Sequence, residues 1–145
     1  MATEELIVLL DARTAKLDAK LNSTNQKLDE YLNIVWKYAG SYSLEKYDTY
    51  QVNINDIQPG DIFIYGGFPG HVVSVVDVIV NKNGNKKFML AQSYMPAQDQ
   101  HILLNPRKEF SVWHDLVSNE NEIITNGGNF NKTQLRRFIN LKNER

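Results

Sequence analysis

The chain has 145 residues, of which 16 are basic and 17 acidic, and its formal net charge is −1. Hydrophobic residues make up 42% and charged residues 23%, which is typical of one compact globular domain. The balanced charge gives no basis for expecting a nucleic-acid or membrane partner, and no apolar run approaches the ~20 residues that span a bilayer. The absence of cysteine excludes disulfides, zinc-thiolate sites and a cysteine nucleophile within this chain.

The N-terminal segment, from Glu4 to about Tyr38, predicts one long helix. Its apolar and weakly polar residues recur at steps of three and four, at Ile7, Leu10, Thr14, Leu17, Leu21, Thr24, Leu28, Tyr31 and Val35. This heptad spacing is typical of a coiled coil and equally of a helix that packs on its own domain. In the coiled-coil interpretation, residues 7–35 would join copies of the chain into a homo-oligomer.

A second interpretation divides this segment. Ser23 and Thr24 fit the start of a new helix that Gly40 would end. The chain would then consist of a helical arm over residues 1–22 and an α+β domain over residues 23–145. The sequence favours neither interpretation over the other.

The remainder predicts a small, mostly antiparallel sheet of three to five strands. Pro59-Gly60 indicates a turn, and the strand "DIFIY" follows it. His71–Val80 and residues 88–94 would form a hairpin, because Asn83-Gly84 is a strong signal for a two-residue turn. Shorter strands are expected within "DQHILLNP" and "NEIITNGGNF".

A short C-terminal helix is expected over "KTQLRRFINL", capped by Asn131 or Thr133. The fold class is therefore α+β, with a long N-terminal helix, the sheet and this last helix. The helical residues expected to pack across the strands are Leu28, Leu32, Val35 and Trp36.

His71 is the principal candidate for chemistry, because it begins a strand directly after the glycine-rich turn "GGFPG". Alternation of side chains gives one face of this strand four members: His71, Val73, Val75 and Asp77. A tight turn at Asn83-Gly84 would bring residues 93–95 level with His71, whereas a bulge would bring Gln92 level instead. A polar group there would hold one ring nitrogen and leave the other for proton transfer.

The alternative for His71 is a purely structural role, which is the commoner one for a lone histidine on an apolar strand. His101 and His114 lie in polar, loop-like contexts. Ser93 lacks the context of a serine nucleophile, and no motif indicates a metal or a nucleotide, so no cofactor is expected. The carboxylates of Asp61, Asp77 and Asp99 are spread along the chain and form no obvious acid–base pair. Asp61 directly follows Pro-Gly, so we expect its side chain to hydrogen-bond to the backbone of that turn.

Three blocks carry a resemblance to a known family: "PGDIFIYGGFPGHVVSVVDV", "FMLAQSYMPAQDQHILLNP" and "NEIITNGGNFNKTQLRRF". They resemble the C-terminal half of a bacterial family catalogued as domain of unknown function 4846. The similarity begins near "LDEYLNIVWKYAG" and ends at about Phe138. Residues 1 to about 22 look unrelated to that family, as though an arm had been joined to a half-domain.

At greater distance, the chain is similar to the papain-like amidases of the CHAP and NlpC types, which cut peptidoglycan stem peptides. The shared pattern is a Pro-Gly-Asp turn, a strand, a Gly-His that opens a second strand and a polar residue that ends a third. The resemblance implies that His71 is the general base and that Gln92, or else Ser93, orients it. Three aromatic residues near this motif would line the cleft or, equally well, belong to the core: Tyr65, Phe68 and Tyr94. Those amidases use a cysteine on a preceding helix, and this chain departs from them there.

Three functions follow as hypotheses. The first is a non-catalytic or incomplete papain-like domain that binds cell-wall peptide or a related amide near His71. The second is a structural module that assembles through the N-terminal helix, and the third is a cysteine-type amidase whose nucleophile comes from another chain. The N-terminus lacks a basic region and a cleavage site, so we expect a cytoplasmic location, or the cell envelope if the chain is a fragment of an exported relative.

Overall fold

The computed structural model of the protein describes residues 2–94, 96, 98–116 and 120–139; for residues 2–12 and for Trp36 it describes the backbone alone. The chain divides into two compact units, Met1–Ala39 and Gly40–Arg145. Each unit is described by itself.

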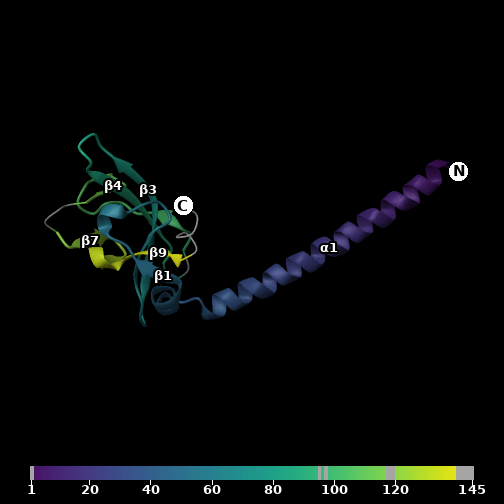
Figure 1. Ribbon diagram of the computed structural model, residues 1–145, viewed down its shortest axis with the longest axis horizontal. Coiled ribbons are helices and arrows are strands. Elements are labelled where there is room, and N and C mark those ends of the chain that lie inside the picture. The colour runs from purple at the N-terminus through teal and green to yellow at the C-terminus, as the bar shows by residue number, and fades with distance from the viewer. Residues whose placement is uncertain (1, 95, 97, 117–119, 140–145) are drawn as a thin grey trace. The chain divides into compact units, whose positions relative to one another are not determined.

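The first unit is a single helix, α1, over Ala2–Tyr38 (Figure 1), which confirms the predicted long helix. The helix is unbroken at Ser23 and Thr24. The Thr24 hydroxyl donates a hydrogen bond to the Lys20 carbonyl oxygen at 2.9 Å, so it bonds back to the preceding turn and caps no new helix. Whether residues 1–22 act apart from residues 23–145 stays a prediction.

The second unit is an antiparallel sheet of seven strands with a separate two-stranded hairpin. The strands run in the order β1-β9-β2-β3-β4-β5, and β6 also pairs with β4. The elements are α2 Ser41–Ser43, η1 Leu44–Asp48, β1 Thr49–Gln51, η2 Ile54–Asp56, β2 Ile62–Tyr65, β3 His71–Val80, β4 Lys86–Gln92, β5 His101–Ile102, β6 Trp113–Asp115, β7 Glu122–Thr125, β8 Gly128–Asn131, η3 Lys132–Gln134 and β9 Leu135–Phe138. The α+β class is confirmed, with more strands than the three to five expected.

The predicted C-terminal helix is wrong. Asn131 does cap a turn, because its side chain accepts a hydrogen bond from the Thr133 N–H at 3.1 Å, but the turn is a single 3-10 turn, η3. The chain then continues as β9, which pairs with both β1 and β2. Leu135 and Arg137 alternate on the buried side of β9, so the period is that of a strand.

The β3–β4 hairpin also departs from the expected geometry. Its last paired residues are Val80 and Lys86, and the Asn81 N–H donates to the Asn85 carbonyl oxygen at 3.0 Å, so the connection is longer than two residues. The register then shifts between Val75 and Asp77, as in a β-bulge. The bulge reverses the alternation: Asp77 is exposed, and Val78 packs against the core in its place.

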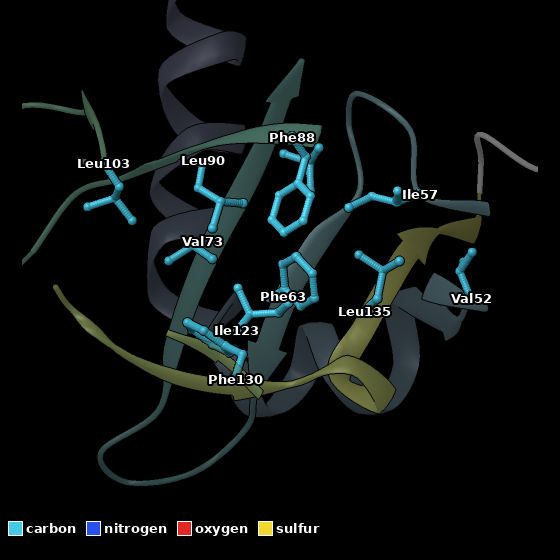
Figure 2. Packing of buried hydrophobic residues seen from close by; sticks show 11 residues of the cluster. Val52, Ile57, Phe63, Val73, Phe88, Leu90, Leu103, Ile123, Phe130 and Leu135 are labelled. Atoms are coloured by element: carbon cyan, nitrogen blue, oxygen red, sulfur yellow. The ribbon is translucent and has the colours of Figure 1, made fainter. Parts of the chain in front are cut away.

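The core lies between the sheet and the β7–β8 hairpin. Phe63 packs against Phe88 on one side and against Phe130 on the other, with ring centroids 5.9 and 6.1 Å apart (Figure 2). The other buried members of this cluster are Val52, Ile57, Val73, Val75, Leu90, Leu103, Ile123 and Leu135. They belong to the second unit, and the expected Leu28, Leu32 and Val35 are not among them; the Trp36 side chain lies outside the described residues.

A buried ion pair joins the start of β2 to β9. The Arg137 guanidinium donates to both carboxylate oxygens of Asp61, at 2.6 and 2.9 Å, and Asp61 is fully buried. The Gln58 N–H also donates to this carboxylate at 2.9 Å, which is the predicted turn bond. Removing one partner of such a buried pair typically costs about 3–5 kcal/mol, so Asp61 has a structural role.

His114 lies in β6, not in the loop that the sequence indicated. Its ring is buried and stacks on Phe88, with centroids 5.7 Å apart. Burial lowers the pKa of His114 below its ordinary value, which keeps the ring neutral. His114 is therefore part of the core packing.

Candidate functional site

The glycine-rich loop before β3 packs closely on the helical segment that begins at Ser41. A Cβ atom on Gly66 would lie 2.9 Å from Tyr42 Cα, and one on Gly70 would lie 2.0 Å from Ser41 Oγ. The Glu45 carboxylate accepts a hydrogen bond from the Gly66 N–H. The two glycines are needed because any side chain would push the loop away from this segment. The contacts fix the position at which β3 begins.

The first residue of β3, His71, forms a hydrogen-bonded pair with the last residue of β4, Gln92. The distance between His71 Nε2 and Gln92 Oε1 is 2.8 Å. An amide oxygen only accepts, so the proton of the neutral ring lies on Nε2 and Nδ1 carries a lone pair. Among the described residues no group hydrogen-bonds to Nδ1. The pair therefore presents Nδ1 as a proton acceptor.

Two aromatic rings hold the imidazole in place. Phe130 from the β7–β8 hairpin stacks on it, with centroids 5.9 Å apart and an interplanar angle of 25°. Tyr94 meets it edge-on, with centroids 5.2 Å apart and an angle of 70°. His71 itself is half-buried. The ring is thus fixed by the core on one side and remains accessible on another.

The turn between β7 and β8 packs against the side-chain amide of Gln92. A Cβ atom on Gly127 would lie 2.2 Å from Gln92 Oε1 and 2.7 Å from Nε2. Thr125 holds this turn, since its hydroxyl accepts from the Gly127 N–H at 3.2 Å and donates to the Gly128 carbonyl oxygen at 2.6 Å. Gly127 and Phe130 were not among the candidates from the sequence, although "TNGGNF" carries the signal of a tight turn between two strands.

A pocket of about 490 Å³ opens beside His71. Among the residues that the structure describes, none that line it is acidic, lysine or arginine; the lining residues are Tyr65, Pro69, Gly70, His71, Ser93, Tyr94 and Gln98. A pocket without charged walls favours a ligand, or part of a ligand, that carries no net charge. Aromatic faces and a few polar groups are the usual lining of a small-molecule site.

The structure brings together most of the residues singled out from the sequence. Tyr65, Tyr94 and Ser93 line the pocket, whereas the Phe68 side chain is 97% exposed and is not part of the lining. Within the described residues Ser93 forms no hydrogen bond to His71, whose Nε2 is paired with Gln92. The roles of these residues in binding or catalysis stay predictions.

The remaining candidates lie outside the pocket. His101 is exposed, and its Nδ1 lies 3.0 Å from the Asp99 carbonyl oxygen. Asp77 is exposed and accepts a hydrogen bond from the Val78 N–H. Within the described residues, no three histidine or carboxylate side chains are grouped as a metal site would require. A search of the same residues for a helix long and apolar enough to cross a membrane finds none.

The contact at Gly127 predicts the effect of a single methyl group. Gly127→Ala would displace the Gln92 amide, lower the free energy of unfolding by about 1–3 kcal/mol and shift the His71 ring signals. Urea denaturation and NMR measure the two effects. Gly40→Ala is the control, because a Cβ atom there meets nothing within 4 Å. Unchanged His71 signals in Gly127→Ala would contradict the proposed support of Gln92.

Comparison with known proteins identifies a family. Residues 5–137 match the family described as domain of unknown function (4846). Since the match begins within α1, the expectation that residues 1–22 are unrelated to the family is wrong, and the match does not support a likeness to the C-terminal half alone. No curated protein and no solved structure matches the chain, so the papain-like resemblance gains no support. The chain belongs to the family of domain of unknown function 4846.

Proposed function

We propose that the second unit is an incomplete papain-like domain that binds an amide, such as a peptide bond of a cell-wall stem peptide, in the pocket beside His71. The hydrogen bond between His71 Nε2 and Gln92 Oε1 carries this proposal. It fixes the ring and its tautomer, so that Nδ1 can accept a hydrogen bond from a ligand N–H group. A histidine that only filled core space would not need a free nitrogen beside a pocket.

The lining of the pocket supports an amide as the ligand. Ser93 and Gln98 supply neutral hydrogen-bonding groups, and the rings of Tyr65 and Tyr94 supply apolar faces. An amide group needs a donor and an acceptor but no compensating charge, which matches a lining whose described side chains include no carboxylate, lysine or arginine. The charged ends of a peptide would remain outside, in solvent.

The absent cysteine limits the chemistry of this pocket. Acyl transfer of the cysteine type begins with a thiolate, and the chain has none. The pair of His71 and Gln92 is therefore the proton-transfer half of such a site. A cysteine from another chain is the alternative that would complete it.

Binding of a muropeptide tests the proposal. Muramyl dipeptide should bind the full chain, and His71→Ala should weaken the affinity at least tenfold, or by about 1.4 kcal/mol, because the ligand loses its acceptor. Isothermal titration calorimetry measures both. His101→Ala should bind as the wild type does, since His101 lies outside the pocket. Equal affinities of wild type and His71→Ala would contradict the proposal.

A second candidate function is assembly through α1, with a second copy of the chain as the partner. Four side chains at heptad positions are at least half exposed: Leu17, Leu21, Leu28 and Tyr31. A helix that exposes such a row of large apolar side chains is typical of a coiled-coil strand. Arg13 and Asp18 would pair across a parallel dimer, which favours a second copy as the partner.

Charge reversal of the apolar row would test assembly. Leu17→Glu with Leu21→Glu should convert an oligomer of the full chain into monomer, because both carboxylates would enter the helix interface. Ala15→Glu with Ala19→Glu adds the same charge outside the apolar a and d positions of the heptad and should leave the oligomer intact. Sedimentation velocity distinguishes these states. A monomeric wild type, or an oligomer that persists after both leucine substitutions, would contradict this second function.

A further inference from the structure

A second histidine, His114, is buried in the sheet and is not among the residues that line the pocket. It lies in the middle of β6, and its side chain is 4% exposed. The ring stacks on Phe88, with centroids 5.7 Å apart and an interplanar angle of 18°. Phe88 in turn contacts Phe63 at 5.9 Å between centroids (Figure 2). The imidazole is therefore packed against the aromatic centre of the core.

One ring nitrogen of His114 has a partner, and the other has none within the part of the chain that the structure describes. The Leu103 backbone forms a hydrogen bond that favours the protonated ring, so the accepting group is the Leu103 carbonyl oxygen. The buried atom without a partner is Nε2, so Nδ1 makes the bond to Leu103. The neutral ring thus carries its proton on Nδ1, and Nε2 holds a lone pair inside the core.

A second proton on this ring would have no acceptor in the folded chain. It would bind to Nε2, whose new N–H group would lack a hydrogen-bond partner among the described residues. The positive charge would lie against the ring of Phe88. A buried charge without a partner is strongly destabilising, whereas the same charged ring is hydrated in water. Protonation therefore favours any state in which the His114 ring reaches solvent.

The strand β6 can bring this ring to solvent without unfolding the whole sheet. It has three residues, and its partner strand within the described residues is β4 alone. The Asn105 amide donates to the Trp113 carbonyl oxygen at 2.8 Å, and Asp115 forms ion pairs with Lys87 at 3.4 Å and Lys108 at 2.5 Å. A short strand held by so few contacts opens at a lower free energy than the domain as a whole.

We propose that His114 is an acid-sensitive switch: protonation of its buried ring releases β6 from β4 and exposes Phe88. The charged side chains on β4, on residues 103–112 and on β6 are Lys86, Lys87, Arg107, Lys108, Glu109 and Asp115. Asp115 follows His114 directly, so its carboxylate lies on the opposite face of β6. Glu109 is exposed, and the others are cations, which accept no hydrogen bond.

Burial sets the direction of the pH response. It lowers the pKa of His114 by more than the Leu103 bond and the Asp115 charge raise it. The open chain binds the proton at the ordinary histidine pKa of about 6.5, so it takes up a proton that the folded chain does not. The stability that the neutral ring provides is complete above about pH 6.5 and is lost as the pH falls further. The Lys108 hydrogen bond lowers the pKa of Asp115, so its ion pairs persist through this range.

Urea denaturation of the full chain at about pH 7 and about pH 5.5 tests the proposal. His114→Asn keeps a donor for the Leu103 carbonyl oxygen and does not titrate in this range. Between the two pH values, the unfolding constant of the wild type should rise about fivefold more than that of His114→Asn. His101→Asn is the matched control, because His101 is exposed, and it should respond as the wild type does. Equal responses of the wild type and His114→Asn would overturn the proposal.

Hydrogen exchange on the wild type locates the opening and keeps the test decisive if His114→Asn folds poorly. Protection of the amides that join β6 to β4, corrected for the intrinsic pH dependence of exchange, should fall about fivefold between the same two pH values. These amides should also remain less protected than those of β2 at both. Protection of β6 that does not change with pH would reject the switch. Equal protection of β6 and β2 would replace the release of β6 with global unfolding and would contradict the proposal.

Discussion

The register shift between Val75 and Asp77 is the constraint on which the candidate site depends. On the turn side of the shift Asp77 pairs with Met89, and on the other side Val75 pairs with Leu90. Continuing the turn-side register would pair Gln92 with Ser74, whose side chain points to the face opposite His71. Since a slip of one residue reverses the faces of a strand, the bulge is what places Gln92 on the face of His71.

The site and the core form one packed structure. Phe130 contacts both Phe63 in the core and His71 at the pocket, and the turn that carries Gly127 presses on Gln92. A ring held by packing on one side and by a buried amide on another needs little reorganisation when a ligand arrives. The sheet thus fixes the geometry of the His71 ring, and the loop at Gly70 leaves one side of it open.

The sequence predicted those elements whose conformation is set by neighbouring residues in the chain. The period of α1, the turn before β2 and the β-branched run of β3 were all readable, and the bulge alternative named Gln92 as the partner of His71. The C-terminal helix was wrong because β9 owes its conformation to β1 and β2, which are distant in sequence. Gly127 was missed for the same reason, since only the folded chain brings it against Gln92.

The tautomer of His71 tests the account most directly. Long-range proton–nitrogen NMR correlations of the imidazole distinguish a protonated Nε2 from a protonated Nδ1. The hydrogen bond to Gln92 predicts the Nε2–H form, with an Nδ1 signal that shifts when muramyl dipeptide is added. A ring protonated on Nδ1, or an Nδ1 signal indifferent to the ligand, would contradict the account.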